Sequence, residues 1–495
     1  MARIELAPGC TGMQKSLGIV EEMLARMREG NEGVRAAAGG SGEFYKREQA
    51  NQEQGRLVGD LVTTREIILA HLDPELVERA MKEAEEYLTG GGKGRKVKKA
   101  GWRSVEVTLM GGNTVRFSTP YLLMVKRGRR GRNRAGKGQG AYPVLRALGI
   151  EEKLTPALRL EIAREVVSAD SYREASEELA RRGIVLGKDL LGEVAVSTGA
   201  KALKLRDARL QSALQESLPR FSSFRGKTVR IALDGGRART REKVMGGGPP
   251  SLQWREPRVL TIDVLGKKGK ANKGFAPVYE TILAGAEATF QMLTSTLRLL
   301  GVHLAKKVLF IADGAPWIEA RACQAIMDAG VDPDKLFLAL DYYHATEKIH
   351  ETLSACSNLD EQSRNTWFTH LKKLLKKPGG ARRVIEELSP LAKGRRAGTI
   401  KKKLRYLEDR LHLMDYALLI RKHLSIGSGV VESAVRRVIN LRFKSASMCW
   451  KPAHLPPLLY LRAILKSGRW DQFVPAFLAS THYLLPNLSL NPKAP

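Results

Sequence analysis

Three acidic residues, far apart along the chain, have the types and local settings that metal-dependent chemistry requires. Asp234 and Asp313 each end a short apolar run and are followed at once by glycine, which is typical of a buried strand that finishes at a functional edge. Glu432 follows a Gly-Ser-Gly break, at the beginning of a helical pattern. Two aspartates at strand ends and one helix glutamate would offer only oxygen ligands, which suit Mg²⁺ or Mn²⁺.

The chain is strongly basic. Its 495 residues include 83 Lys or Arg and 52 Asp or Glu, which gives a net charge of +31. Such a charge attracts a polyanion, so the acidic residues point to phosphodiester chemistry on nucleic acid rather than to an acidic protein partner. A ribosomal or membrane-surface role would tolerate the same charge. The length and a hydrophobic content of 43% predict several domains with a substantial core.

The cysteines and the hydropathy pattern indicate a cytoplasmic protein. No Cys-x-x-Cys pair occurs, which argues against a zinc ribbon and a disulfide framework and suits a reducing compartment. The four cysteines are Cys10, Cys323, Cys356 and Cys449. No run of about 18 apolar residues and no signal peptide is present, so we expect no membrane association.

The first 150 residues predict a helical region followed by a basic one. Residues 1–90 have mostly helical patterns, and residues 91–150 form a basic β/linker region. Within it, Ser104–Leu109 and Thr114–Phe117 predict a hairpin, with a third short strand at Tyr121–Val125. The basic run that follows predicts a flexible phosphate-binding arm, with a solvated linker as the alternative. Its candidate contacts are Lys126, Arg127, Arg129 and Arg130.

Residues 151–205 predict a helical DNA-binding domain. Thr155-Pro156 begins a helix whose Leu158, Ile162 and Val166 share one face. A capping box at Ser171 opens a second helix, and a third runs from about Lys188 to Thr198. The last two helices fit a helix-turn-helix, and a plain helical hairpin packed on a core is an equal alternative.

From Val229 the pattern changes to strands that later alternate with helices. This order predicts an α/β fold, a mixed sheet with helices on both faces. Residues 346–425 have no strand pattern and predict an all-helical insertion. The expected strands are Val229–Leu233, Val259–Val264, Val278–Leu283, Val308–Ala312 and Leu336–Leu340.

These residues resemble a known family. Strand Asp, strand Asp, helical insertion and helix Glu, in that order, resemble the DDE transposases of bacterial insertion sequences, which have an RNase H-like core. Asp341-Tyr-Tyr-His344 resembles the Asp-x-x-His motif of the Mutator-type members. The resemblance covers about residues 225–475 and is most specific from Gly427 to Trp450. It implies a catalytic core in two parts, 206–345 and 426–475, with a tail at 476–495.

The resemblance also implies roles for the residues. Asp234, Asp313 and Glu432 would hold two Mg²⁺ or Mn²⁺ ions, which activate the attacking oxygen and stabilise the leaving one. Asp341 and His344 would support this site. The partners would be double-stranded DNA, namely transposon ends and target, bound by a homodimer or larger assembly in the bacterial nucleoid. No protein nucleophile is needed, because water and then a DNA 3′-hydroxyl would attack.

Each candidate has a structural alternative. The two aspartates could merely cap turns, Glu432 could pair with Arg436, and His344 could be a hydrogen-bonded structural histidine. Asp263 is a reserve candidate, expected to be a paired or edge-exposed acid. The basic neighbours are expected to contact phosphate, or else to form a solvated face: Arg237, Arg239, Arg241, Arg436, Arg437, Arg442 and Lys444. Trp317 and Trp450 could stack on an unpaired base, although core packing is the commoner fate.

Two rival functions remain open. An RNase H-like nuclease without strand transfer would have an identical site. A metal-free DNA-binding protein descended from a transposase is the second rival, although such a protein would have no reason to keep three carboxylates. The terminal repeat, the target preference and the transposition pathway have no signature in the sequence.

Overall fold

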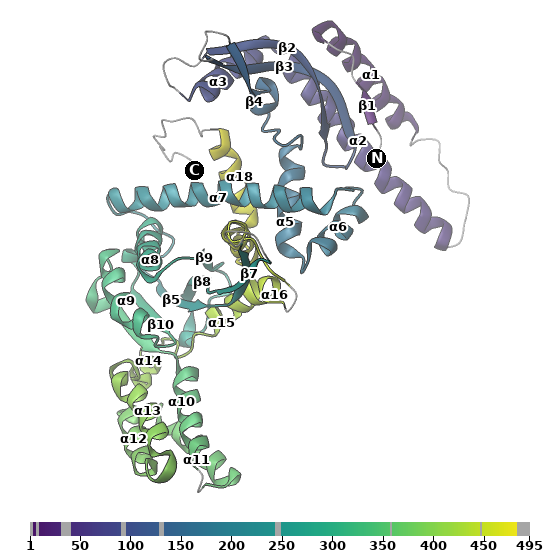
Figure 1. Ribbon diagram of the computed structural model, residues 1–495. Coiled ribbons are helices and arrows are strands. Elements are labelled where there is room, and N and C mark those ends of the chain that lie inside the picture. Colours follow the sequence, from purple (N-terminus) through teal and green to yellow (C-terminus); the bar gives the residue numbers. More distant parts are fainter. Residues whose placement is uncertain are drawn as a thin grey trace. The chain divides into compact units, whose positions relative to one another are not determined.

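The computed structural model describes residues 3–5, 9–30, 41–90, 96–127, 133–242, 249–356, 359–445 and 448–482. The chain divides into two compact units, one of residues 1–198 with 472–495 and the other of residues 199–471. Each unit combines helices with a β-sheet, so the predicted mixed α/β class is found (Figure 1). Within the described ranges, no helix has both the length and the apolar character needed to cross a membrane.

The sheet of the first unit is built around one long hairpin. β2 (Lys96–Thr108) and β3 (Thr114–Arg127) are antiparallel, as predicted around the Gly111-Gly112 turn. The separate strand predicted at Tyr121–Val125 is wrong, because these residues continue β3 past Pro120. That proline lies opposite Trp102, where the register shifts, so β3 continues although proline cannot donate a ladder hydrogen bond. β1 (Arg3–Glu5) and β4 (Asn133–Ala141) also pair with β3.

The helices predicted within residues 1–90 pack on this sheet. They are α1 (Gly9–Gly30), α2 (Ser41–Leu72) and α3 (Pro74–Thr89). Val107 and Phe117 of the hairpin share a buried cluster with Leu61 and Ile68 of α2. The helical region and the basic β region therefore form one hydrophobic core.

The predicted basic arm begins and ends in strands. Lys126 pairs with Arg134 and Arg127 pairs with Asn133, which joins the end of β3 to the start of β4. Residues 128–132 lie outside the described part of the chain. The side chains of the four candidate contacts, Lys126, Arg127, Arg129 and Arg130, also lie outside it.

The predicted helical unit is present, with a longer third helix. α4 (Pro143–Ala147) leads to α5 (Pro156–Ser168), α6 (Tyr172–Arg181) and α7 (Lys188–Gln215). The predicted capping box is confirmed for its Ser171 half, whereas Glu174 reaches the residue before the N-cap instead of the N-cap itself. The Ser171 hydroxyl accepts from Glu174 N at 3.0 Å, and the Glu174 carboxylate accepts from Asp170 N at 2.7 Å.

The predicted end of α7 at Thr198 is wrong, because good helix formers continue beyond it with buried Ala202, Leu210 and Ala213 at helical spacing.

The second unit contains a five-stranded mixed sheet. Its strand order is β11-β10-β5-β8-β9. β8 runs antiparallel to both of its neighbours, whereas β5, β10 and β11 are parallel to one another. All five strands lie where the sequence predicts them: β5 (Thr228–Gly235), β8 (Arg258–Leu265), β9 (Val278–Ile282), β10 (Lys307–Ala312) and β11 (Leu336–Leu340).

Helices cover the two faces of this sheet. On one face, Ile231 and Phe310 share a buried cluster with α8 (Ala286–Leu300) and α9 (Pro316–Asp328). Successive strand residues point to opposite faces, so Ala232 and Ile311 face the other way. There α15 (Gly429–Val435) contacts β5 and β8, and α17 (Leu455–Lys466) contacts β9.

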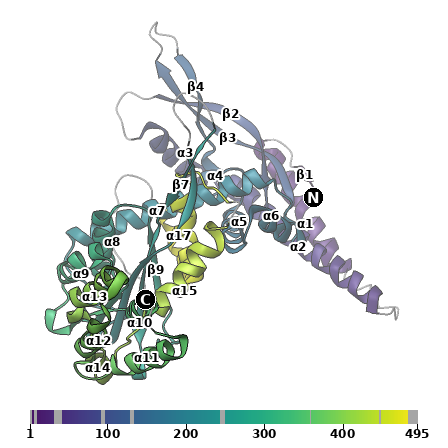
Figure 2. The ribbon, with the colours of Figure 1, turned by 60° about the horizontal axis from the view of Figure 1, so that its bottom comes forward.

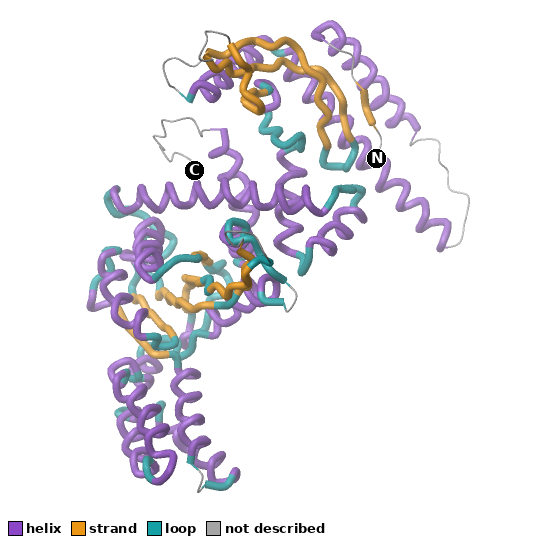
Figure 3. The backbone as a smooth tube through the Cα atoms, in the orientation of Figure 1, coloured by secondary structure: helices purple, strands orange, loops and turns teal. Residues whose placement is uncertain are grey.

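The segment between β11 and α15 consists of helices joined by loops, with no strand among its described residues, as predicted for the insertion (Figure 3). It comprises α10 (Tyr342–Ala355), α11 (Glu361–Leu374), α12 (Gly380–Leu388), α13 (Ala397–Asp409) and α14 (Tyr416–Arg421). The chain then returns beside β11, where Tyr342 N donates to Ile426 O at 2.9 Å. The two ends of the insertion thus lie next to each other at the end of β11.

A separate hairpin follows β5. It consists of β6 (Ala238–Glu242) and β7 (Ser251–Arg255), which form their own two-stranded sheet. After α15, a π-helical turn, η7 (Arg436–Asn440), leads to α16 (Leu441–Phe443). α18 (Trp470–His482) ends the described chain.

Candidate active site

Asp234 and Asp313 lie side by side at the ends of adjacent parallel strands. The register pairs Lys307 with Thr228 through to Ile311 with Ala232, a constant offset of 79 residues (307 minus 228). Asp313 minus Asp234 is also 79, so these two positions continue the same register. Neighbouring strands are about 4.8 Å apart. By alternation, both carboxylates share the face of Ala232 and Ile311, which is the face covered by α15.

Asp341 follows the next strand, β11, at the corresponding position, but both of its carboxylate oxygens accept hydrogen bonds from the backbone. β11 pairs Leu340 with Ala312, which places Asp341 level with Asp313. It is completely buried, and its Oδ1 accepts from Tyr343 N at 2.5 Å and from His344 N at 3.3 Å. Its Oδ2 accepts from Ser428 N. Asp341 therefore caps α10 and ties it to the residue that precedes α15.

Glu432 is placed by an anchored segment just before it. Arg230, on the central strand, donates to Ser425 Oγ at 3.0 Å and to Gly427 O at 3.3 Å. Together with Asp341, it fixes the segment from which α15 begins. Glu432 lies exposed in the first turn of that helix. Among the ion pairs of the described residues, none joins Glu432 to Arg436, so the structural alternative for Glu432 is not realised.

Two glycines allow the site to be this compact. Gly314, directly after Asp313, has φ +75°, a left-handed conformation that favours glycine. A Cβ on Gly236 would lie 2.8 Å from Ile439 of the turn after α15. The glycine directly after Asp313 is therefore explained by a tight turn, and the second glycine after Asp234 by close packing.

The environment of Asp234 disfavours its charge. Burial raises the pKa of Asp234 to about 6, the hydrogen bond from Gly235 N opposes this shift, and the negative charges of Asp313 and Glu432 add to it. Nearby His344 lowers the pKa. Asp313, Glu432 and His344 are thus all close enough to influence Asp234.

The three carboxylates offer the oxygen ligands that a hard divalent cation prefers, but they are not yet arranged around a common metal position. Oxygen donors are what Mg²⁺ and Mn²⁺ prefer, and the mutual repulsion at Asp234 is what a cation would relieve. Within the described residues, no group of three or more His, Cys, Asp or Glu side chains lies in a metal-holding arrangement. A cation would have to draw the three carboxylates together.

The other acidic and histidine candidates have structural partners. Asp263 is buried and receives two hydrogen bonds from Arg230, at 3.0 and 2.8 Å. Of the two expected settings, a paired acid or an edge-exposed acid, Asp263 has the first. His344 Nδ1 lies 3.4 Å from Glu347 and remains partly exposed.

The basic neighbours divide into surface and structural residues. Arg237, Arg241, Arg436 and Lys444 are exposed, and Arg239 is half-buried. Arg437 donates to Tyr279 Oη at 2.6 Å. Arg442 is 2% exposed, with its guanidinium 5.0 Å from the Trp450 ring, because α16 turns it into the core. The expected phosphate contact does not fit the burial of Arg442.

Of the two tryptophan candidates, the structure describes the side chain of Trp450, which is not available for stacking on a base. Trp450 is 6% exposed and packs against Phe443 at a ring distance of 4.9 Å, so core packing is its observed fate. The side chain of Trp317 lies outside the described residues.

Two residues of the insertion hold the Asp313 turn and were missed by the sequence analysis. Tyr406 Oη donates to Asp313 O at 2.7 Å, and Arg410 Nε donates to Gly314 O at 2.7 Å. Arg410 follows α13, and it is buried although charged. A spacing of four residues would place both side chains on one helix face, but only the fold brings that face to Asp313.

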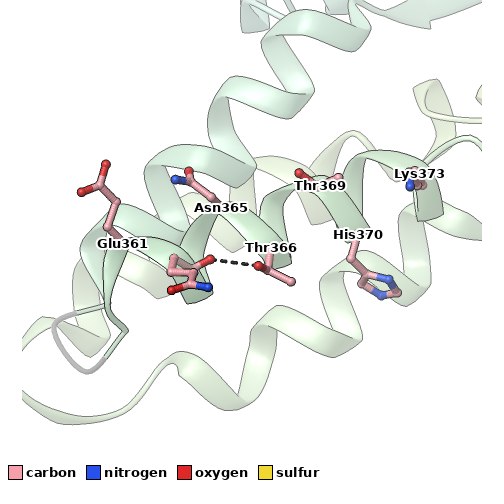
Figure 4. Close-up of a pocket in the computed structure, with 7 residues that line it drawn as sticks. Glu361, Asn365, Thr366, Thr369, His370 and Lys373 are labelled. Carbon is pink, nitrogen blue, oxygen red and sulfur yellow. Dashed lines mark hydrogen bonds between the residues drawn. The ribbon is translucent and has the colours of Figure 1, made fainter.

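A shallow hollow elsewhere has none of this chemistry. It lies along α11 and is lined by residues of that helix alone (Figure 4). These are Glu361, Gln362, Asn365, Thr366, Thr369, His370 and Lys373. Side chains from one helix face do not converge on a ligand, so the carboxylate site remains the better candidate.

Comparisons with known proteins leave the family open. No protein-family model matches the chain, and no curated protein matches it in sequence. Among solved structures, the chain is similar to one described as a Drosophila P element transposase strand transfer complex. The identity is 12%, the TM-score is 0.24, and the match covers 68% of this chain and 83% of that chain. So low a TM-score carries no argument about this chain, and the Mutator-type resemblance rests on the motif residues alone.

Proposed function

We propose that the protein is a DNA transposase that binds the terminal repeats of an insertion sequence, cuts DNA at their ends and joins them to target DNA. The observation that carries this proposal is the register of Asp234 and Asp313 on adjacent parallel strands, with Glu432 close enough to add to their repulsion. Three carboxylates gathered in a chain of net charge +31 favour phosphodiester chemistry.

We further propose that residues 206–345 and 426–475 form an RNase H-like catalytic core. The five-stranded mixed sheet with helices on both faces supports it, as does the position of the acids at strand ends. The helical segment between Asp341 and Gly429 supports the Mutator-type arrangement, in which an insertion separates the second Asp from the Glu.

In this proposal Asp234, Asp313 and Glu432 hold two Mg²⁺ or Mn²⁺ ions. When bound, such ions activate the attacking oxygen and stabilise the leaving oxygen of a phosphodiester. The chain's own contribution is to present the carboxylates. Asp341 and Arg230 fix the segment before Glu432, while Tyr406 and Arg410 fix the turn after Asp313.

DNA binding is proposed for the exposed basic residues and for the α6–α7 pair. Arg237, Arg241, Arg436 and Lys444 would contact phosphates near the site. α6 and the start of α7 are joined by residues 182–187, a connection that suits a helix-turn-helix with α7 as the recognition helix. Two transposon ends must meet, so we propose that the working form is a homodimer or larger assembly on DNA.

The test is excision from a donor plasmid that carries a marker between the ends flanking this gene. Wild-type protein with Mg²⁺ should release the marker and insert it elsewhere, and Asp234→Asn should do neither. Excision without reinsertion would favour the nuclease alternative. DNA binding with no metal-dependent cleavage under any condition would favour the metal-free DNA-binding protein.

A further inference from the structure

The hairpin of β6 and β7 has two unlike faces. Cross-strand pairing sets Arg239 against Trp254 and Arg241 against Leu252, so these four side chains share one face. Trp254 is 57% exposed and Leu252 is 54% exposed, while the Arg239 guanidinium lies 5.9 Å from the Trp254 ring. This set is called the ribbon face below.

The opposite face of the hairpin is satisfied within the protein. Thr240 is buried there, and Arg255 Nε donates to Glu242 at 3.1 Å. The one carboxylate within these two strands is thus paired and points away from the ribbon face. Within β6 and β7 the ribbon face has two basic and two exposed apolar side chains, and the next acid along the chain, Glu256, follows directly after β7.

The hairpin is a continuation of the two central strands past the candidate site. Gly235 pairs with Arg258 at the end of β5 and β8, and Gly236 N then donates to Pro257 O at 2.9 Å before β6 begins. Arg239, opposite Trp254, is five residues beyond Asp234. At about 3.4 Å per residue this is at most roughly 17 Å along the ribbon, or about five base steps of DNA.

The ribbon is also held in place on its second edge. Arg241 N donates to Trp450 O at 2.8 Å, and Trp450 N donates to Arg239 O at 2.9 Å. The Trp450 ring is packed in the core against Phe443. The exposed Trp254 therefore belongs to a strand pair that is hydrogen-bonded to the core along a second edge. Such a backbone would hold the indole in place under a flat ligand.

We propose that Trp254 stacks on an unpaired base of bound DNA, with Arg239 and Arg241 contacting the adjoining phosphates and Leu252 extending the apolar surface. An exposed indole with the Arg239 guanidinium 5.9 Å from its ring, and with Arg241 on the same face, matches the two parts of a nucleotide, since the base stacks on an aromatic ring and the phosphate binds a cation. The inference rests on the proposed DNA activity of the same site, because it places the unpaired base near the carboxylates.

The experiment uses full-length protein and a short DNA duplex with one extrahelical 2-aminopurine, compared with the fully paired duplex. Binding and 2-aminopurine fluorescence are measured with EDTA present, so that no cleavage occurs. Wild-type protein should bind the extrahelical duplex more tightly and quench its fluorescence. Trp254→Ala should weaken that binding roughly 5-fold to 100-fold, the usual range for one stacked base, and abolish the quenching. Trp254→Phe should restore most of both.

Gln253→Ala is the matched control, since Gln253 is exposed on the same strand but faces the other way. It should behave as wild type. Wild-type affinity and quenching in Trp254→Ala would overturn the inference, even if Asp234→Asn abolishes cleavage and the proposed function stands. Loss of quenching in Trp254→Ala with no metal-dependent cleavage by wild-type protein would support the base site while removing the transposase.

Discussion

Carboxylates on one face of the central sheet are treated in opposite ways. Asp263, in the middle of β8, receives two hydrogen bonds from Arg230, and Asp341 accepts from three backbone N–H groups. Asp234 and Asp313, at the ends of β5 and β10, each accept one backbone N–H, from Gly235 and Ala315. Hydrogen bonds thus compensate the negative charges of Asp263 and Asp341, which serve the structure. The charges of Asp234 and Asp313, called the edge acids below, receive less compensation.

This difference is a physical criterion for telling structural acids from candidate functional ones, and it needs no knowledge of relatives. A buried carboxylate that is fully hydrogen-bonded is stable where it stands. A half-buried one beside other negative charges is kept at a cost in stability, which is a feature of functional sites. The predictions below test whether the two groups of acids differ as this comparison requires.

The largest expected effect is on cleavage. Replacing Asp234, Asp313 or Glu432 with Ala should lower the rate of DNA cleavage by about 1,000-fold or more, because each would remove a ligand of the proposed catalytic ions. Affinity for DNA should stay nearly unchanged, since it comes mainly from Lys and Arg contacts to phosphate. Gel-based cleavage and fluorescence anisotropy measure the two quantities. Near-normal cleavage by one variant would remove that residue from the site.

The next effect is on stability and concerns the compensated pair. Arg230→Met should lower the free energy of unfolding by about 3 to 5 kcal/mol, because it leaves the Asp263 charge buried without a partner. The double variant Arg230→Met with Asp263→Leu should recover part of this loss. Urea unfolding provides the measurement. If the single variant is as stable as wild type, Asp263 is not held by Arg230 and the comparison fails.

A smaller effect is expected at Asp341. Asp341→Ala should lower the free energy of unfolding by about 2 to 4 kcal/mol, since it removes a helix cap and the acceptor for Ser428 N. Cleavage should also fall, because the segment before Glu432 loses an anchor. Asp341→Asn keeps one acceptor oxygen and should lie between Ala and wild type in both assays. Wild-type cleavage by Asp341→Ala would show that Asp341 does not position Glu432.

Much of the second unit could be predicted from the sequence, because its signals are local. Five apolar strand patterns predicted β5, β8, β9, β10 and β11, and the two Asp-Gly pairs located the ends of β5 and β10. The sequence did not show that Asp234 and Asp313 lie level on adjacent strands, because this follows from the offset of 79 residues between β5 and β10. Glu432 was identified from its Gly-Ser-Gly break and the family resemblance, but its nearness to Asp234 depends on the path of the helical insertion, which no local pattern contains.

The failures have one physical cause, which is that burial depends on partners distant in sequence. Arg442 had the composition of a DNA surface, but α16 turns it into the core. Trp254 had no motif at all, and its exposure follows from the pairing of β6 with β7. Tyr406 and Arg410 are ordinary helix-face residues until α13 is placed beside Asp313.

The smallest expected effect is an increase in the free energy of unfolding, and it tests most directly whether the two groups of acids differ. The pKa of Asp234 is raised to about 6 from its ordinary 3.8, so the folded protein disfavours the charged form. The destabilisation is therefore full above pH 6 and disappears as the pH falls towards 3.8. This difference corresponds to at most about 3 kcal/mol, and solvent screening of the half-buried side chain reduces it.

Without metal at pH 8, Asp234→Asn should therefore raise the free energy of unfolding, by an amount that shrinks to nothing towards pH 4. Mg²⁺ should stabilise the wild type more than the variant, because the ion compensates the charge that the variant lacks. Asp263→Asn is the control from the compensated group and should destabilise the protein at pH 8, since it weakens a paired acid. Urea unfolding across this pH range measures all three proteins. If both Asn variants destabilise the protein equally at pH 8, Asp234 is as well compensated as Asp263, and the edge acids have no special need of a cation.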